Sequence, residues 1–195
     1  MKRFTLGALA LALPLAVTAA PESYTIDPVH SFSHFAVDHL GVATIWGRFD
    51  KMGGKFTIDR AAKKGALELA VETASVSTGD SDRGARPRSR DEHLRSADFF
   101  NVAEFPRMTY KAAEVTFNGD SPAEIAGQLT LLGVTRPVTL KIGRWVCKDH
   151  PFSKKPMCGG EALAVLKRTD FGMKYGVPAV GDEIRIVVGF EAYKD

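Results

Sequence analysis

The sequence predicts an all-β, antiparallel domain, and three observations lead to that prediction. Short segments of alternating apolar and polar residues recur from residue 24 onward, which is the period-two pattern of half-buried strands. Turn residues separate these segments roughly every 8–12 residues. No segment alternates with long helical patterns, as β-α-β folds require. Sequential strands joined by hairpins indicate an antiparallel sandwich or an up-and-down barrel.

Turn signals set the limits of each expected strand. Asp27-Pro28 separates the first two strands, Gly53-Gly54 is expected to form a hairpin turn, and Gly133 is expected to adopt a positive φ in a later hairpin. The expected strands cover residues 24–26, 31–39, 45–49, 55–59, 67–71, 108–117, 125–132, 138–146, 162–167 and 184–190.

One long interval, residues 75–106, interrupts the strand pattern. It begins as a polar, arginine-rich segment, and Ser89 and Glu92 then form an S-x-x-E capping box at the start of a short helix. The apolar pair Phe99 and Phe100 follows the helix. Connections this long are uncommon inside a compact β domain and are usually functional. We therefore expect a lid across one end of the domain, with both phenylalanine rings buried or facing the interior.

Inward-facing side chains of the predicted strands converge on a single interior. Eight strands enclose a space that either packs solid or holds one small ligand. The strand pattern alone favours a packed core, whereas the lid and the signal peptide expected in the first 19 residues favour a cavity. Small inward residues such as Ser33, Gly47, Ala112 and Gly127 stand among large ones, which predicts an elongated void. The candidate cavity-lining residues are Phe35, Val37, Ile45, Phe49, Leu67, Leu69, Phe99, Phe100, Met108, Tyr110, Gly127, Leu129, Leu131, Leu140, Ile186 and Val188.

The first 19 residues have the composition of a signal peptide. Lys2 and Arg3 precede an apolar run, and Val17-Thr18-Ala19 is a small-residue cleavage site. We expect cleavage near Ala19, export to the periplasm and a single mature domain over residues 20–195. Without Lys2 and Arg3 the basic residues number 24 against 23 acidic ones. This balance argues against a nucleic-acid partner, because such proteins concentrate positive charge.

The two cysteines, Cys147 and Cys158, are expected to form a disulfide, because an even pair at short separation in an exported protein is typical of one. The residues between them show no strand pattern. A metal site built from Cys147, His150 and Cys158 is the alternative, but it lacks an evident fourth ligand. No catalytic motif is recognisable, and we expect neither a metal nor an enzymatic activity.

Motifs in order along the mature chain resemble those of the YceI-like family of exported bacterial proteins that bind polyisoprenoids. Each motif is weak alone, but together they span nearly all of the mature chain. They are YTID at 24–27, HS at 30–31, FxVxHxG at 35–41, GxF at 47–49, SVSTG at 75–79, RDxHLRSxDFF at 90–100, FP at 105–106, GxLTLxGVT at 127–135, KRTDFG at 167–172 and VGDEI at 180–184.

The resemblance implies an antiparallel, eight-stranded, lipocalin-like barrel whose interior takes an isoprenoid or another long-chain lipid for transport or storage. It implies no catalytic residue and no cofactor other than such a bound lipid. A homodimer and a transient contact with a membrane or membrane protein are further expectations. The polar motif residues suit either ligand contact or bracing of the lid, and they are His30, His39, Thr78, Asp91, His93 and Asp170. The alternative is a structural or interaction module with a barrel filled by its own side chains and an outward surface at Phe32 and Trp46.

Overall fold

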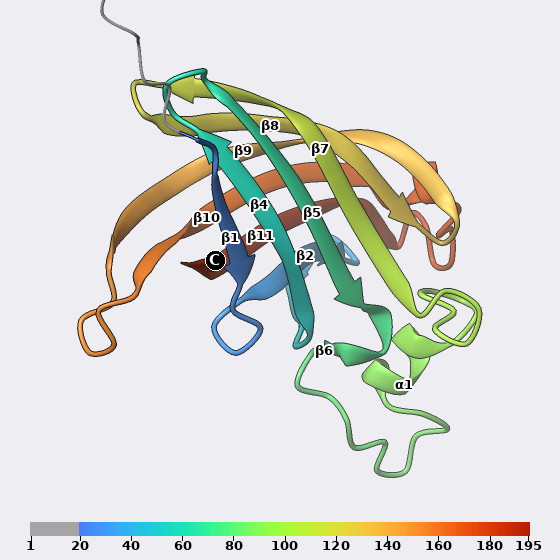
Figure 1. Cartoon of the computed structure of the whole chain (residues 1–195). Coiled ribbons are helices and arrows are strands. Elements are labelled where there is room, and N and C mark those ends of the chain that lie inside the picture. Colours follow the sequence, from blue (N-terminus) through green and yellow to red (C-terminus); the bar gives the residue numbers. More distant parts are fainter. Residues whose placement is uncertain (1–19) are drawn as a thin grey trace, which may run out of the picture.

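Antiparallel strands build almost all of the chain that the structure, a computed structural model, describes, namely residues 20–195 (Figure 1). The expected signal peptide, residues 1–19, lies outside the described residues. The strands are β1 Glu22–Ile26, β2 Phe32–His39, β3 Ala43–Phe49, β4 Met52–Asp59, β5 Lys64–Glu72, β6 Val76–Ser77, β7 Arg107–Asn118, β8 Ser121–Leu131, β9 Val134–Asp149, β10 Pro156–Lys167 and β11 Val180–Lys194. One α-helix, α1 (Arg90–Arg95), and two 3-10 turns, η1 (Thr73–Ser75) and η2 (Arg168–Phe171), complete the described part.

These strands form a closed barrel with eight strand positions, as the family resemblance implies. The hydrogen-bonded order is β1-β4-β5-β7-β8-β9-β10-β11-β2-β3-β6, and β1 also pairs with β11, which closes the sheet. Three positions are each divided between two strands. β1 and β2 share the position beside β11. β3 and β4 share the next position, and β5 and β6, which η1 joins, share the one after it.

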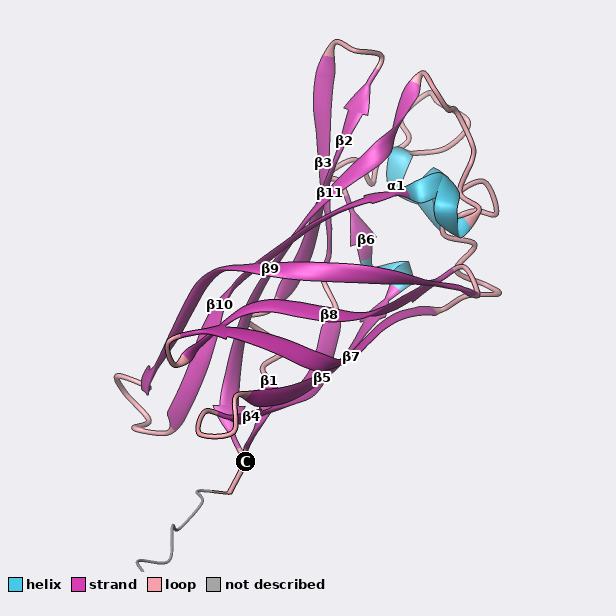
Figure 2. Ribbon diagram, turned by 90° about the horizontal axis from the view of Figure 1, so that it is seen from above, coloured by secondary structure: helices cyan, strands magenta, loops and turns pink. Residues whose placement is uncertain are grey.

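A bend interrupts the first of these positions at the sequence Asp27-Pro28. Proline cannot donate a ladder hydrogen bond, and the Asp27 carboxylate accepts a hydrogen bond from the backbone N–H of Val29 at 2.9 Å. The Asx turn formed in this way redirects the chain between β1 and β2. Figure 2 shows that the hairpin of β2 and β3 extends beyond the rest of the barrel, on the side where α1 also lies.

Two turns differ in how well the sequence predicts them. Gly133 has a φ of 72° in the β8–β9 turn, as expected. Gly53 and Gly54, in contrast, lie inside β4, which begins at Met52. The expected hairpin turn is wrong, because β3 and β4 do not pair with each other and Asp50 and Lys51 join them end to end. A side chain at Gly54 would meet the backbone of β5, so this glycine permits close strand approach and does not make the turn.

The cysteine hairpin is longer than its sequence suggests. β9 continues to Asp149 and β10 begins at Pro156, so much of the segment expected as an irregular loop is strand. Cys147 and Cys158 occupy directly facing positions of these strands and are joined by a disulfide with an S–S distance of 2.02 Å. The expected disulfide is confirmed, and it excludes the alternative metal site. The ring Nδ1 of His150 instead accepts hydrogen bonds from the backbone N–H groups of Phe152 and Ser153.

Candidate functional site

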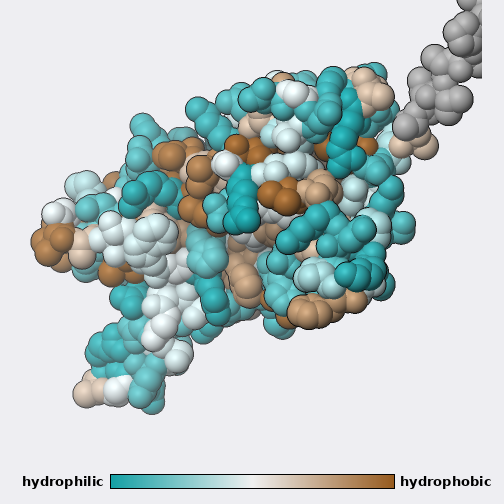
Figure 3. All heavy atoms as spheres, turned by 90° about the vertical axis from the view of Figure 1, so that its left-hand side faces the viewer, coloured by the Kyte–Doolittle hydropathy of each residue, from teal (hydrophilic) through white to brown (hydrophobic). Residues whose placement is uncertain are grey.

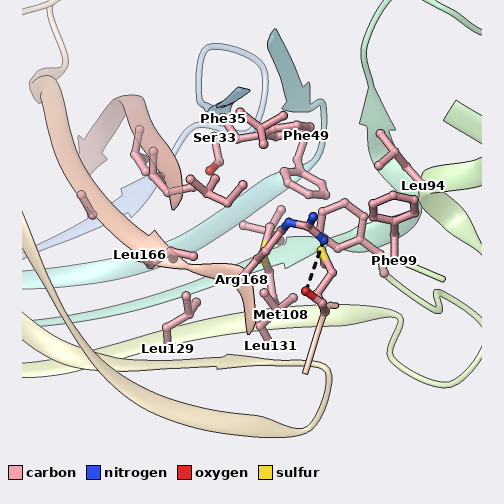
Figure 4. A pocket seen from close by; sticks show the side chains of 18 of the residues that line it. Ser33, Phe35, Phe49, Leu94, Phe99, Met108, Leu129, Leu131, Leu166 and Arg168 are labelled. Atoms are coloured by element: carbon pink, nitrogen blue, oxygen red, sulfur yellow. Dashed lines mark hydrogen bonds between the residues drawn. The ribbon is translucent and has the colours of Figure 1, made fainter. Parts of the chain in front are cut away.

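The interior of the barrel contains a cavity of about 390 Å³ next to the lid. Figure 4 shows side chains from strands on opposite sides of the barrel pointing into it. We call the part of the barrel around this cavity the open half. Its lining residues are Ser33, Phe35, Val37, His39, Ile45, Phe49, Met52, Leu69, Val71, Thr78, Arg90, His93, Leu94, Phe99, Phe100, Met108, Thr109, Tyr110, Leu129, Leu131, Val138, Leu140, Ala164, Leu166, Arg168, Met173, Tyr175, Val180, Ile184, Ile186 and Val188.

Strand parity predicts most of this lining. On β2, alternate side chains from Ser33 to His39 face the cavity, because successive residues of a strand point to opposite sides. All but two of the residues expected from sequence to line a cavity do so. The exceptions are Leu67 and Gly127.

Leu67 lines a second, smaller hollow of about 50 Å³ deeper in the barrel. Three aromatic rings border this hollow and a fourth, Tyr24, stacks on one of them. We call the part of the barrel around these four rings the packed half: Tyr24, Phe56, Trp145 and Phe190. The ring centroids of Tyr24 and Phe56 are 4.8 Å apart, and those of Phe56 and Trp145 are 5.5 Å apart. Four residues line both hollows, which places the two next to each other: Met52, Leu69, Leu140 and Val188.

Gly127 does face inward, but it leaves no void. A Cβ atom at this position would lie 2.5 Å from the ring of Tyr110, so the ring occupies the space that the glycine vacates. Phe35 covers Gly47 on the neighbouring strand in the same way. The expectation that small inward residues create the cavity is therefore wrong at these two positions, because aromatic neighbours fill them.

Tyr110 is held in place by its hydroxyl group, which lies 2.8 Å from the carbonyl oxygen of Ile125 and 2.9 Å from that of Val138. Burial raises the pKa of Tyr110 to about 12. The phenol therefore stays neutral over the physiological pH range and contributes a ring face, not a charge, to the cavity.

The lid is fixed by a capping box and by a buried carboxylate. The hydroxyl of Ser89 accepts a hydrogen bond from the N–H of Glu92, and the Glu92 carboxylate accepts one from the N–H of Ser89, as the sequence predicts. Asp91 is buried and accepts hydrogen bonds from the N–H and the hydroxyl of Thr78. These bonds tie α1 to the end of β6 and hold the lid against the barrel.

Both phenylalanines after the helix face the cavity, as expected. The Phe100 side chain is buried, and its ring packs edge-on against Phe49 with 5.1 Å between centroids. Phe99 is half-buried, and its ring contacts those of His93 and Tyr175. The lid thus supplies an aromatic wall to the open half.

The other polar motif residues lie in three different parts of the structure. Thr78, His39 and His93 line the cavity. His30 lies on the bend between β1 and β2, where its hydrogen bond with Asp27 raises the pKa of the imidazole. Asp170 lies in η2.

Arg168 is a functional candidate that the strand pattern does not reveal. It lines the cavity although its side chain is only 2% exposed. Its guanidinium donates to the backbone carbonyls of Gly181, Met173 and Val180, and Figure 4 draws one hydrogen bond of this group as a dashed line. The only sequence signal for this residue is its membership of the KRTDFG motif, because its three partners lie in a loop and at a strand start that no periodicity places beside it.

Comparisons with known proteins agree with this architecture. The model of the YceI-like domain matches residues 24–192. The chain belongs to the YceI-like family. A UPF0312 protein of Pseudomonas aeruginosa is 38% identical over 199 residues, with both chains fully covered. Protein YceI of Escherichia coli is 34% identical over 197 residues, with 98% of this chain and 97% of that protein covered.

A solved structure shows the same fold. It is a polyisoprenoid-binding domain from Saccharophagus degradans implicated in plant cell wall breakdown, with a TM-score of 0.63. The two sequences are 17% identical, and the match covers 88% of this chain and 98% of that one. At this identity the likeness establishes the shared barrel.

Proposed function

We propose that this protein binds an isoprenoid, or a comparable long-chain amphiphilic lipid, with its apolar tail inside the open half of the barrel. The observation that carries the proposal is the cavity of about 390 Å³ with an almost entirely hydrocarbon lining. Its size is within the usual range for ligand sites. Each buried CH₂ group contributes about 0.8 kcal/mol, so a tail of many carbons binds even after its ordering cost.

The family and the neighbour support a binding role. The YceI-like domain covers nearly the whole mature chain, and the solved neighbour is described as polyisoprenoid-binding. The disulfide between Cys147 and Cys158 is typical of proteins that fold in an oxidising compartment. We therefore place the proposed binding in the periplasm, where a protein with a closed apolar cavity is suited to carry or store a lipid, as a monomer or as a homodimer.

A membrane contact is part of the proposal, because a lipid of this kind resides in a bilayer. The tip of the β2–β3 hairpin exposes Leu40 and Val42, which are 59% and 85% exposed. This tip forms the brown projection at the left of Figure 3. The N–H of Leu40 donates to the carbonyl of Ala179, and the adjacent Val180 lines the cavity. An apolar tip joined to the cavity wall is suited to touch a bilayer while a lipid enters.

A second candidate function is an interaction module whose barrel is only a scaffold. Two observations favour it: the packed half is filled by its own aromatic rings, and Trp46 on the outer face is 56% exposed. In this case the open half would hold no specific ligand.

Extraction of the purified mature protein with organic solvent, followed by mass spectrometry, separates the two candidates. We expect one lipid per protein, dominated by a long-chain isoprenoid or related amphiphile. A protein purified from its native compartment that contains no lipid, and that binds none after incubation with polyprenyl lipids, would contradict the proposal and leave the interaction module.

A further inference from the structure

The polar lining of the large cavity carries charge of one sign only. Among the described residues that border it, Arg90, Arg168, His39 and His93 are basic, and none is aspartate or glutamate. A site with apolar walls and a few cationic groups favours a ligand with an apolar body and a negative head. This inference rests on the proposed function and concerns the head group of the lipid.

Arg168 differs from the arginines of the lid in what it contacts. Arg86 pairs with Asp80 at 2.6 Å, and Arg88 pairs with Asp98 at 2.9 Å. Arg168 is nearly inaccessible, yet its hydrogen-bond acceptors are three neutral carbonyl oxygens at 2.8–3.2 Å. No ion pair within 4.0 Å involves it in the described chain.

A nearby carboxylate does not neutralise this charge directly. Asp182 accepts hydrogen bonds from the N–H and the hydroxyl of Thr169, each at 2.9 Å. Burial lowers the pKa of the Arg168 guanidinium, and the charge of Asp182 opposes this shift only through space. A buried cation that meets only neutral dipoles is costly, and an anion beside it recovers part of the lost solvation.

The guanidinium of Arg168 also retains donor capacity. A guanidinium has five N–H groups, and the hydrogen bonds to carbonyls use three nitrogens once each, so one N–H remains on each terminal nitrogen. Figure 4 shows the group inside the cavity, near the ring of Phe99. Two free N–H groups in this plane are suited to a phosphate or carboxylate.

The lid places two further basic side chains, His93 and Arg90, on the wall of the same cavity. The guanidinium carbon of Arg168 lies 6.0 Å from the centre of the Phe99 ring, and the His93 ring lies 4.9 Å from the same ring. Arg90 stands one turn before His93 on α1, and its Nε donates to the hydroxyl of Thr78, which also lines the cavity. Its pairing with Asp80 is loose, at 4.0 Å.

We propose that Arg168, with Arg90 as a second cation, binds the anionic head group of the lipid, a phosphate or a carboxylate, beneath the lid. The apolar tail then runs from this point toward the packed half. A phosphate and a carboxylate share the chemistry of negatively charged oxygens, and the experiment below distinguishes them.

The test measures binding of three probes with one tail to the delipidated mature protein: geranylgeranyl phosphate, geranylgeranoic acid and geranylgeraniol. We expect the wild-type protein to bind the phosphate about tenfold or more tightly than the alcohol, as charge-assisted hydrogen bonds in a dry site do. Equal preference for the acid identifies a general anion site, whereas preference for the phosphate alone identifies a phosphate site.

Three variants test which arginine causes the preference for the anionic probes. Arg168→Gln removes the charge and should abolish the anion preference while affinity for the alcohol stays within a few-fold. Arg90→Gln should reduce the preference partly, and it serves as the second test if Arg168→Gln does not fold. Arg95→Gln is the matched control, because Arg95 also donates to backbone carbonyls, those of Ala74 and Val76, but does not line the cavity.

Each outcome has one meaning. Equal affinity of the wild-type protein for all three probes overturns the anionic head-group site and leaves the proposed tail binding intact. Anion preference that persists in both Arg168→Gln and Arg90→Gln also overturns it. If the protein binds none of the three probes and no polyprenyl lipid with a longer tail, the proposed function itself is contradicted.

Discussion

The open half and the packed half are built from the same strands, yet one encloses a cavity and the other is filled. β4 contributes to both, since Met52 lines the large cavity and Phe56, four residues along the same face, lies among the rings of the packed half. The open half is lined by aliphatic side chains, methionines and aromatic rings, and the rings of Phe99 and Phe100 belong to the lid that covers it. The packed half brings four aromatic rings together. The same strands thus permit both a cavity and a filled interior, and the packing of the inward aromatic rings against one another decides which part is filled.

Truncation of an inward side chain should destabilise the packed half more than the open half. Phe56→Ala should reduce the free energy of unfolding by about 3–5 kcal/mol, because it opens a cavity in a packed region. Leu129→Ala should cost less, since the Leu129 side chain already borders empty space and loses fewer contacts. Denaturant unfolding of the two variants measures the difference. Equal losses would show that the open half is packed as tightly as the other.

Removing the disulfide should weaken folding without emptying the cavity. Replacing Cys147 and Cys158 by alanine should lower the free energy of unfolding by about 3 kcal/mol, because the unfolded chain gains freedom when a short loop is no longer closed. Neither cysteine lines the large cavity. Lipid content per folded molecule should therefore be unchanged, as measured by extraction after removal of unfolded protein. A parallel loss of lipid would show that the two halves are coupled.

The boundary between the halves should limit tail length. Met52 lines both hollows, so Met52→Ala should join them and let longer tails enter. Mass spectrometry of the extracted lipid should show a length distribution shifted toward longer chains. Met108→Ala is the matched control, because Met108 lines only the large cavity and does not separate it from the packed half. An identical distribution in wild type and Met52→Ala would place the end of the tail elsewhere.

The smallest effect is expected at the surface of the lid end. Val42→Ser should leave the melting temperature unchanged, because the residue is 85% exposed in the folded protein and unfolding therefore costs it no packing. It should slow uptake of lipid from vesicles, because less apolar surface then enters the bilayer. Affinity for lipid dispersed in detergent should stay the same. Uptake from vesicles at the wild-type rate would show that this tip does not take part in lipid entry from the bilayer.

Periodicity in the sequence could predict the antiparallel strands and most of the cavity wall, and the family motifs select the barrel over a sandwich. The alternation on β2 places Phe35 and Val37 correctly, and the capping box at Ser89 locates the lid helix. Parity gives the direction of a side chain but not what occupies the space in front of it. Tyr110 fills the space above Gly127 because its hydroxyl reaches carbonyls on two neighbouring strands, and only the three-dimensional register places those groups.

Arg168 escapes sequence reasoning for a related reason. It follows β10 in a short polar turn, where an exposed side chain is the ordinary expectation. Its burial depends on carbonyl groups that the chain presents five to thirteen residues later. Contacts of this kind are set by how the loop before β11 folds back, which no local pattern encodes.

The most direct test of the central claim fills the open half from within. Leu129→Trp places an indole in the cavity, whereas Gln128→Trp places the same group on the exposed outer face of the same strand. Both proteins should fold, with a cost of roughly 1–3 kcal/mol for the inward variant. We predict that extracted lipid falls sharply in folded Leu129→Trp and stays at the wild-type level in Gln128→Trp. Equal lipid content in the two folded variants would contradict a ligand site inside the barrel.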